Sequence, residues 1–186
     1  MENYKLQSED FLTQIILQKE VRTWFDLIDY VKNIPYGRNL SRTDFSLVIS
    51  EHKGTCSSKH GLLQKVAELH KKHEYELVIG IYKMNILNTP KIGNALSQSN
   101  LNYIPEAHCY IKHNNGVIDV TSTSSDFERI EKDILVEKII TPDQVGEFKI
   151  RYHQDFIKNW IVSNDMKMRF EEVWKIREQC ILNLSN

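Results

Sequence analysis

The sequence predicts an α+β protein, because helical spacing of apolar residues marks both ends of the chain and strand-type segments lie between them. The chain has 186 residues, of which 41% are hydrophobic and 26% charged, the balance of an ordinary globular protein. This length is enough for one hydrophobic core. We therefore expect a single domain over residues 1–186, with a core at about 35–140 and helical extensions at both ends.

The N-terminal part of the chain is predicted to be helical. Helical spacing of apolar residues over 11–31, with Ser8 as the N-cap, fits either one interrupted helix or two. Pro35 and Gly37 then end this pattern. Residues 37–53 are expected to form an irregular loop with, at most, a short turn in it.

The middle of the chain is predicted to supply one helix and the sheet. A helix is expected to begin near Cys56, because Ser57 and Ser58 can cap it and apolar residues then recur at helical spacing. The apolar, β-branched segment 77–84 predicts a buried strand. The polar segment 85–104, which contains Pro90 and Gly93, predicts a long loop.

A β-hairpin and one further strand are predicted next. Segments 108–112 and 117–121 flank His113-Asn114-Asn115-Gly116, which is a good hairpin turn sequence. If the loop has an even number of residues, odd-numbered residues on one strand lie opposite even-numbered residues on the other. Residues 134–140 are expected to form another strand.

Two amphipathic helices are predicted to complete the chain. Thr141, Pro142 and Gln144 suit an N-cap, a first-turn proline and the third position of a capping box. A second helix is expected to start at Ser163-Asn164-Asp165. The apolar stripe of the first helix is expected to consist of Val145, Phe148, Tyr152, Phe156 and Trp160.

Cys56 is the candidate nucleophile. A thiol in the first turn of a helix feels the positive end of the helix dipole, which favours the thiolate and lowers the pKa of the cysteine. The backbone amides of that turn offer part of an oxyanion hole, and Gly54 permits close approach of a substrate. A second oxyanion donor could come from Arg38 or Asn39 in the preceding loop, unless these are ordinary surface-loop residues.

His108 and Asp119 are the candidate base and its orienting carboxylate. Side chains alternate between the faces of a sheet, so His108 shares a face with Tyr110 and Lys112. With an even hairpin loop, Asp119 joins that face within diagonal reach of His108. Asp119 would then accept a hydrogen bond from one imidazole nitrogen while the other nitrogen faces the Cys56 thiol.

Three short motifs resemble the transglutaminase-like superfamily of papain-like Cys-His-Asp enzymes. They are Gly54-Thr55-Cys56 before a helix, His108-Cys109-Tyr110 on a strand, and Asp119-Val120-Thr121, which is similar to the D-P-T of that family. The likeness runs from about Lys53 to Thr121. It implies a nucleophile helix packed on an antiparallel sheet that presents the histidine and the aspartate. Differences from the common family residues at Ser57–His60 leave the substrate class open.

Together, the candidate residues and the family resemblance predict thiol-dependent acyl transfer or amide hydrolysis by a triad of Cys56, His108 and Asp119. The substrate would be a protein, a peptide or a small amide. The sequence does not choose between transglutaminase-like transfer and cysteine protease or amidase activity, and it leaves the oligomeric state open. The alternative is a transglutaminase-like fold that binds a partner without catalysis, anchored through aromatic residues of the C-terminal helices.

Composition and charge argue against several other classes of function. The 24 basic and 25 acidic residues nearly cancel, so no nucleic-acid partner is expected. No apolar stretch reaches about 18 residues, which argues against a membrane partner, and no signal-peptide pattern opens the sequence. Three cysteines are an odd and sparse set for a disulfide framework. We therefore expect a cytoplasmic protein that needs no cofactor.

A metal site is the remaining alternative for the histidines and cysteines. Cys56 and His60 have a C-x3-H spacing, and His70 and His73 have an H-x2-H spacing. Structural zinc sites usually combine pairs such as C-x2-C with H-x3-H, and this chain lacks such a pair of pairs. We expect no metal site, and we expect His60, His70 and His73 to be exposed positions on their helix.

Overall fold

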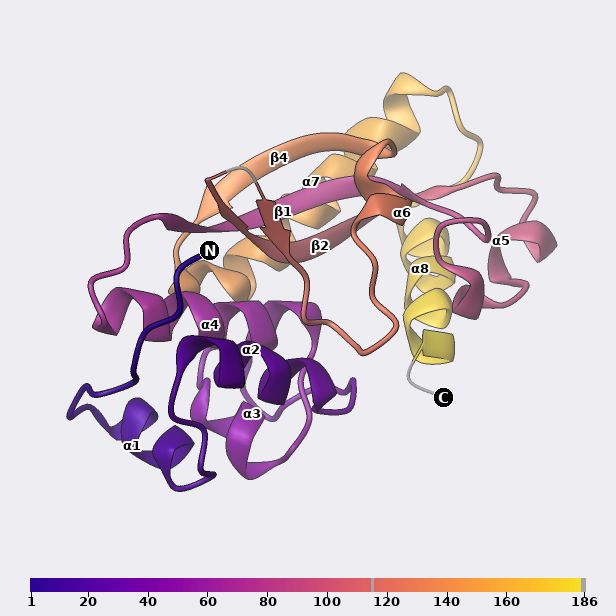
Figure 1. Ribbon diagram of the computed structural model, residues 1–186. Helices are drawn as coiled ribbons and strands as arrows, with labels where there is room; N and C mark the ends of the chain where they lie inside the picture. Colours follow the sequence, from indigo (N-terminus) through magenta and orange to yellow (C-terminus); the bar gives the residue numbers. More distant parts are fainter. Residues whose placement is uncertain (115, 185–186) are drawn as a thin grey trace. The chain divides into compact units, whose positions relative to one another are not determined.

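The computed structural model describes residues 1–114 and 116–184, and these residues form a mixed structure of helices and one sheet (Figure 1). Four strands form the antiparallel sheet, in the order β3-β2-β1-β4. This confirms the expectation of an α+β chain with an antiparallel sheet. The strands are β1 (Tyr75–Met84), β2 (Ile104–His113), β3 (Gly116–Ile118) and β4 (Ile134–Ile140).

Helices precede, interrupt and follow the strands. The α-helices are α1 (Phe11–Leu17), α2 (Trp24–Asn33), α3 (Ser46–Ser50), α4 (Cys56–Leu69), α5 (Ala95–Gln98), α6 (Glu128–Glu131), α7 (Glu147–Ser163) and α8 (Phe170–Leu184). Two short 3-10 helices are η1 (Pro90–Ile92) and η2 (Pro142–Val145). The segment predicted as a long loop over 85–104 therefore contains η1 and α5.

The N-terminal helical pattern is split into two helices, one of the two predicted alternatives. Between them, Glu20 has a positive φ of 62°, which breaks the helical path. Thr23 then starts α2 with a capping box that involves Asp26. The N-cap of α1 is Asp10, whose carboxylate accepts a 2.8 Å hydrogen bond from the Thr13 amide. The prediction of Ser8 as the cap was wrong by two residues.

The chain divides into two compact units, each made of several stretches of sequence. Unit 1 comprises Met1–Ile79, Cys109–Ser125 and Lys138–Gly146. Unit 2 comprises Gly80–His108, Asp126–Glu137 and Glu147–Asn186, of which the last two residues are outside the described part. The expectation of a single domain over residues 1–186 stays a prediction.

In unit 1, helix α4 is the central helix. It contacts α2, α3 and η2, and most of its residues are buried. Its apolar side chains pack into a core whose members are fully buried or nearly so, among them Trp24, Leu27, Val48, Leu62 and Val66. Because α4 is covered by its neighbours, its position and the path of the chain at its first turn are closely determined.

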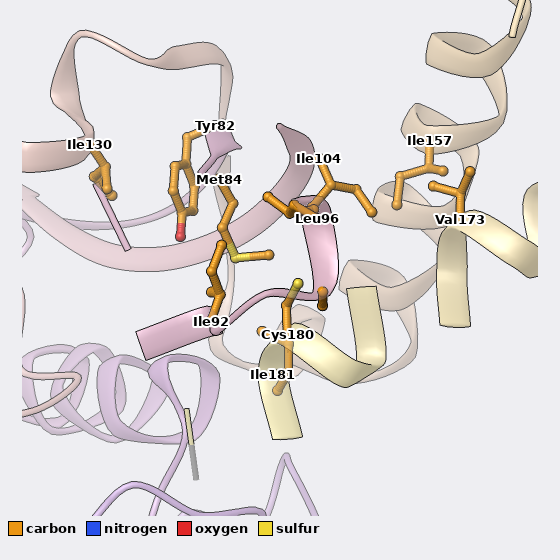
Figure 2. Packing of buried hydrophobic residues seen from close by; sticks show 11 residues of the cluster. Tyr82, Met84, Ile92, Leu96, Ile104, Ile130, Ile157, Val173, Cys180 and Ile181 are labelled. Carbon is orange, nitrogen blue, oxygen red and sulfur yellow. The ribbon is translucent and has the colours of Figure 1, made fainter. Parts of the chain in front are cut away.

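Unit 2 has its own apolar core, shown in Figure 2. Helix α8 contacts η1, α5 and α7. Buried side chains from these elements and from the strands form one cluster, which includes Tyr82, Met84, Ile92, Ile157 and Cys180. Cys180 thus belongs to this core, and burial raises its pKa to about 11. We infer a packing role for this thiol.

The hairpin of β2 and β3 has the predicted parity, but its second strand is shorter than predicted. Ile111 pairs with Ile118 and His113 with Gly116, so odd-numbered residues lie opposite even-numbered ones. Asn115 of the predicted turn lies outside the described residues. The strand predicted over 117–121 ends at Ile118, which leaves Asp119 beyond it.

The C-terminal helices differ from the prediction in their buried face and in one boundary. The capping box of Thr141 and Gln144 is present, but it begins the 3-10 helix η2, and α7 follows after Gly146. The second helix begins at Phe170, several residues after the predicted start at Ser163–Asp165.

The buried residues of α7 are Lys149, His153 and Ile157, one position further along than the predicted stripe. The reason is a buried charge: Glu106 is 6% exposed and accepts two hydrogen bonds from the Arg177 guanidinium. His153 donates a 2.8 Å hydrogen bond to the Pro105 carbonyl beside that carboxylate. The polar face of α7 is turned inward because it completes this charged cluster.

Candidate active site at the start of helix α4

Cys56 is the first residue of α4, as the sequence predicts. Thr55 is the N-cap residue and Ser58 completes a capping box, with a 3.0 Å hydrogen bond from the Thr55 amide to the Ser58 hydroxyl. The Cys56 thiol is only partly buried, whereas Cys109 and Cys180 are buried. Cys56 therefore combines the helix-start position with access to solvent, which reactive cysteines need.

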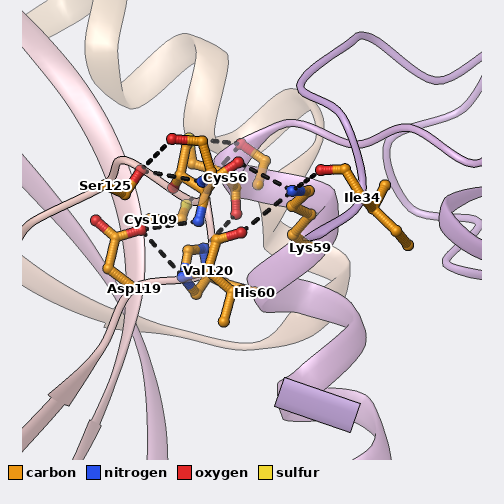
Figure 3. Close-up of polar contacts among 11 residues, drawn as sticks. Ile34, Cys56, Lys59, His60, Cys109, Asp119, Val120 and Ser125 are labelled. Atoms are coloured by element: carbon orange, nitrogen blue, oxygen red, sulfur yellow. Dashed lines mark hydrogen bonds and ion pairs between the residues drawn. The ribbon is translucent and has the colours of Figure 1, made fainter. Parts of the chain in front are cut away.

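Four consecutive polar residues after Cys56 are buried. Ser57 is 3% exposed, Ser58 1%, and Lys59 and His60 both 0%. Buried polar side chains cost free energy unless they are hydrogen-bonded, and a buried ammonium costs most. Such a run is therefore unusual for a helix that only packs. Figure 3 shows Lys59 and His60 of this run among the polar contacts near Cys56.

His60 joins α4 to the segment that follows β3. Its Nε2 accepts a 2.9 Å hydrogen bond from the Val120 amide, and its Nδ1 lies 2.7 Å from the Cys56 carbonyl oxygen (Figure 3). Because Nε2 is an acceptor, this pattern assigns the proton to Nδ1, which donates to Cys56. The prediction that His60 is exposed was wrong: its ring is buried because it satisfies backbone groups of two segments.

Asp119 lies beside the same imidazole, and its side chain is only 7% exposed. One carboxylate oxygen, Oδ1, accepts a 3.0 Å hydrogen bond from the Thr121 amide and lies 3.6 Å from His60 Nε2. The amides of Val120 and Thr121 are thus used by side chains instead of by a neighbouring strand. This explains why β3 ends at Ile118. It also brings the predicted Asp119 to the first turn of α4 through His60.

Lys59 supplies a buried cation at this place. Its Nζ donates to the Ile34 carbonyl, and to the carbonyls of Val120 at 3.2 Å and Thr121 at 3.0 Å (Figure 3). Burial lowers the pKa of Lys59 to about 8, while negative charge on Asp119 and Cys56 acts in the opposite direction. The lysine is therefore electrostatically linked to both of these predicted site residues.

Gly54 has a packing role that the sequence did not predict. A Cβ at this position would lie 2.8 Å from Cγ of Lys59 and 3.2 Å from the Ser58 hydroxyl oxygen. Gly54 is buried, and its backbone bonds to that of Pro35 and Gly37 at 3.1 Å each. The absent side chain therefore makes room for the Lys59 stem. Close approach of a substrate at Gly54 stays a prediction.

Asn39, one of the two candidate oxyanion donors, supports the helix start instead. Its side-chain oxygen accepts a 2.7 Å hydrogen bond from the Ser58 hydroxyl, and its amide nitrogen donates to the Lys53 carbonyl at 2.8 Å and to Glu51 at 3.0 Å. These bonds tie the loop before α4 to its first turn. An oxyanion role for Arg38 stays a prediction.

Ser57 lies between two thiols. Its hydroxyl oxygen is 4.0 Å from the Cys56 sulfur and 3.9 Å from the Cys109 sulfur, which donates to it. With its own proton the serine can therefore hydrogen-bond to sulfur at Cys56. This contact stabilises a thiolate more than a thiol, since an anionic sulfur is the better acceptor.

His108, the predicted base, lies on β2 and belongs to unit 2, whereas Cys56 and Asp119 belong to unit 1. Its imidazole is partly buried. Its ring centroid is 6.3 Å from that of Tyr82, in an edge-to-face arrangement. The contacts within unit 1 thus bring together two of the three predicted triad residues, and His108 as their partner stays a prediction.

Other kinds of site receive little support in the described part of the chain. Among those residues, no group of three or more His, Cys, Asp or Glu is arranged to hold a metal ion. No described helix has both the length and the apolar character needed to cross a bilayer. An open, partly acidic depression does occur in unit 1, but no residue of α4 lines it; its lining is Glu20, Val21, Phe25, Asp26, Asp29, Tyr30 and Asn33.

Comparison with known proteins gives no assignment. Protein-family models, curated proteins and solved structures yield no match to this chain. The chemistry of the site therefore has to be argued from its own residues.

Lys59 and His60 were not predicted as buried residues of the site, although two signals in the sequence could have identified them. Lys59 is three, four and seven residues before Leu62, Leu63 and Val66, so helical spacing puts it on the apolar face of α4. His60 follows Cys56 by four residues and therefore shares its side of the helix.

Proposed function

We propose that this chain is a thiol-dependent enzyme with a transglutaminase-like, papain-like core, in which Cys56 is the nucleophile. In this proposal α4 is the nucleophile helix, His108 is the general base, and Asp119 orients the imidazole of His108. The substrate is an amide or a related acyl compound in a protein, a peptide or a small molecule. The observation that carries the proposal is that His60 lies against both the Cys56 carbonyl, at 2.7 Å, and the Asp119 carboxylate, at 3.6 Å, near the start of α4.

The reaction would run in two halves. His108 takes the thiol proton of Cys56, and the thiolate attacks the carbonyl carbon of the amide. As the C–N bond breaks, His108 gives its proton to the leaving amine, and a thioester to Cys56 remains. Water or a second amine then attacks the thioester carbonyl and loses a proton to His108. The C–S bond breaks and the proton returns to sulfur, which regenerates the thiol.

Three features of unit 1 support the first half of this reaction. The positive end of α4 favours negative charge at Cys56. The buried Lys59 ammonium interacts with charge at Cys56. The hydroxyl of Ser57 lies 4.0 Å from the sulfur. Each favours the thiolate, which is the attacking species.

The test is the reactivity of Cys56 toward iodoacetamide as a function of pH, followed by peptide mass spectrometry. We expect rapid alkylation near neutral pH in the wild type, and at least a tenfold loss of rate in His108→Ala, because the base is absent. Cys109 and Cys180 are both 0% exposed, so they serve as internal controls that stay unlabelled while the protein is folded. Lys65→Ala, at an exposed position of α4, is the matched control variant.

Alkylation of Cys56 only at the pH of an ordinary thiol, with no effect of His108→Ala, would contradict the proposal. A second measurement separates hydrolysis from transfer. A peptide-amide substrate is incubated with and without an added primary amine, and the products are identified by mass. The acid product indicates a hydrolase, and the amine adduct indicates an acyltransferase. Absence of both products from a Cys56 that alkylates rapidly would favour a binding module.

A further inference from the structure

We propose that Lys59 is a positioning residue for the Cys56 chemistry: its buried ammonium joins the Ile34 and Val120–Thr121 backbone segments to α4 and acts as a fixed positive charge for an ionised Cys56. This inference rests on the proposed function and identifies the group that would stabilise its thiolate. It is drawn from contacts within unit 1 alone. Lys59 need not touch a substrate to act in this way.

The hydrogen bonding of Lys59 is complete. An ammonium has three N–H donors, and Nζ has three carbonyl partners, those of Ile34, Val120 and Thr121. The side chain is 0% exposed, and a Cβ at Gly54 would contact its stem. The ammonium is therefore held at one place, as a group that acts through its charge must be.

The burial of an ammonium group at this position is energetically unfavourable by itself. Removing a charge from water costs free energy even after the protein relaxes, so an apolar side chain would serve packing better. This desolvation cost indicates that the charge of Lys59 has a function of its own. Cys56 and Asp119 are the two groups whose negative charge raises the pKa of Lys59, against the larger effect of burial. The interaction is mutual, so the ammonium stabilises negative charge on both residues.

Other charged or titratable groups also lie near the start of α4. On the preceding loop, Glu51 and Lys53 form their own ion pair at 3.6 Å. On α4, His60 is an acceptor at Nε2 and is therefore neutral. On the segment after β3, Asp119 is the charged side chain, and it has the opposite sign. Lys59 differs from these groups as a buried ammonium held by three carbonyls.

The main experiment compares the pH profile of Cys56 alkylation in the wild type and in Lys59→Gln. Glutamine keeps N–H donors for the backbone carbonyls but removes the charge. We expect the alkylation midpoint to rise by about one pH unit, which is about a tenfold lower rate near pH 6.5. Lys65→Gln removes a charge from the exposed side of the same helix and should leave the midpoint unchanged. Unlabelled Cys109 reports that each variant is folded.

A second measurement decides the question if Lys59→Gln does not fold. The pKa of the Lys59 ammonium is measured by NMR in the wild type and in Cys56→Ser, which keeps Lys59 and nearly preserves the shape of the side chain at 56. Because the interaction is reciprocal, we expect this pKa to fall when the ionisable thiol is removed. An unchanged pKa of Lys59 would overturn the inference.

The outcomes also separate this inference from the proposed function. If wild-type Cys56 alkylates near neutral pH and a folded Lys59→Gln protein has the same midpoint, the enzyme proposal stands and the role of Lys59 is refuted. If wild-type Cys56 behaves as an ordinary thiol, both proposals are refuted. A raised midpoint in Lys59→Gln, with no change in Lys65→Gln, supports both.

Discussion

The imidazole of His60 accepts a hydrogen bond from the Val120 amide at 2.9 Å while its other nitrogen lies 2.7 Å from the Cys56 carbonyl. The buried His60 side chain thus connects Cys56, the proposed nucleophile, with Val120, which follows Asp119 in the sequence. His60 is also unsuitable as the base for Cys56, because its Nε2 already accepts the hydrogen bond from the Val120 amide. His60 is therefore a structural link, and the base has to be another group.

Replacement of His60 by alanine is expected to destabilise the protein by about 3 kcal/mol, because it leaves a cavity and takes the partner from a buried amide. Urea denaturation measures this change. His60→Asn can keep one of the two bonds and should cost less than His60→Ala. The exposed His73 is the matched control: His73→Ala should change the free energy of unfolding by less than about 0.5 kcal/mol. Equal effects at 60 and 73 would refute the linking role.

Gly61→Ala is expected to destabilise the protein although alanine is the better helix former. A Cβ at Gly61 would lie 2.4 Å from Cε1 of Phe45, a ring that is 7% exposed. We expect a net loss of about 2 kcal/mol, because the overlap outweighs the helix preference of about 1 kcal/mol. A double-mutant cycle with Phe45→Leu, measured by urea denaturation, should show a favourable coupling of about 1 kcal/mol or more. Additive effects would show that the ring is not the cause.

His153 is expected to make stability depend on pH. Burial lowers its pKa from the ordinary 6.5, assisted by the positive charges of Arg177 and Lys149 and opposed by Glu106. The folded protein therefore binds the proton less readily than the unfolded chain. Its contribution to stability is complete above about pH 6.5 and is lost as the pH falls through the lowered pKa.

The test compares the free energy of unfolding from about pH 7 to pH 5 in the wild type and in His153→Gln. Glutamine can still donate to the Pro105 carbonyl but does not titrate. We expect a shallower decline in this variant. His73→Gln, at an exposed position, should follow the wild type. A decline in His153→Gln as steep as that of the wild type would assign the pH dependence to other groups.

Much of the secondary structure could be predicted because local signals were sufficient. Strand β4 and the helix start at Cys56 follow from apolar spacing, capping residues and breakers. The end of β3 could not be predicted in this way. It depends on His60, a residue sixty positions earlier, which takes the Val120 amide. The buried face of α7 was predicted wrongly for a similar reason, because His153 is buried through its contacts with Pro105 and Glu106.

The candidate site was predicted in part by its residue types. Cys56 at a helix start was a local pattern, and the structure confirms it. The hairpin parity was confirmed too. The buried Lys59 and His60 were not anticipated, because lysine and histidine are usually partly exposed and single-residue burial depends on tertiary packing. The Lys59 side chain also explains why residue 54 is a glycine, since a Cβ there would overlap it. This packing role could not be inferred before Lys59 was known to lie against Gly54.

Gly54 provides a direct test of how closely Lys59 is held. In Gly54→Ala the new methyl group would lie 2.8 Å from Cγ of Lys59, and the ammonium cannot move without losing bonds to the Val120 and Thr121 carbonyls. We expect a loss of about 2 kcal/mol in the free energy of unfolding.

Lys59→Ala removes Cγ, so in the double variant the overlap disappears and a coupling of about 1 kcal/mol or more is expected. Gly37→Ala is the control, because the three atoms nearest to its new Cβ belong to the Lys53 side chain, the first at 3.3 Å. Because Lys53 is a partly exposed side chain that can give way, Gly37→Ala should cost much less. If Gly54→Ala and Lys59→Ala prove additive, the lysine stem is free to shift, and a fixed charge beside Cys56 loses its structural basis.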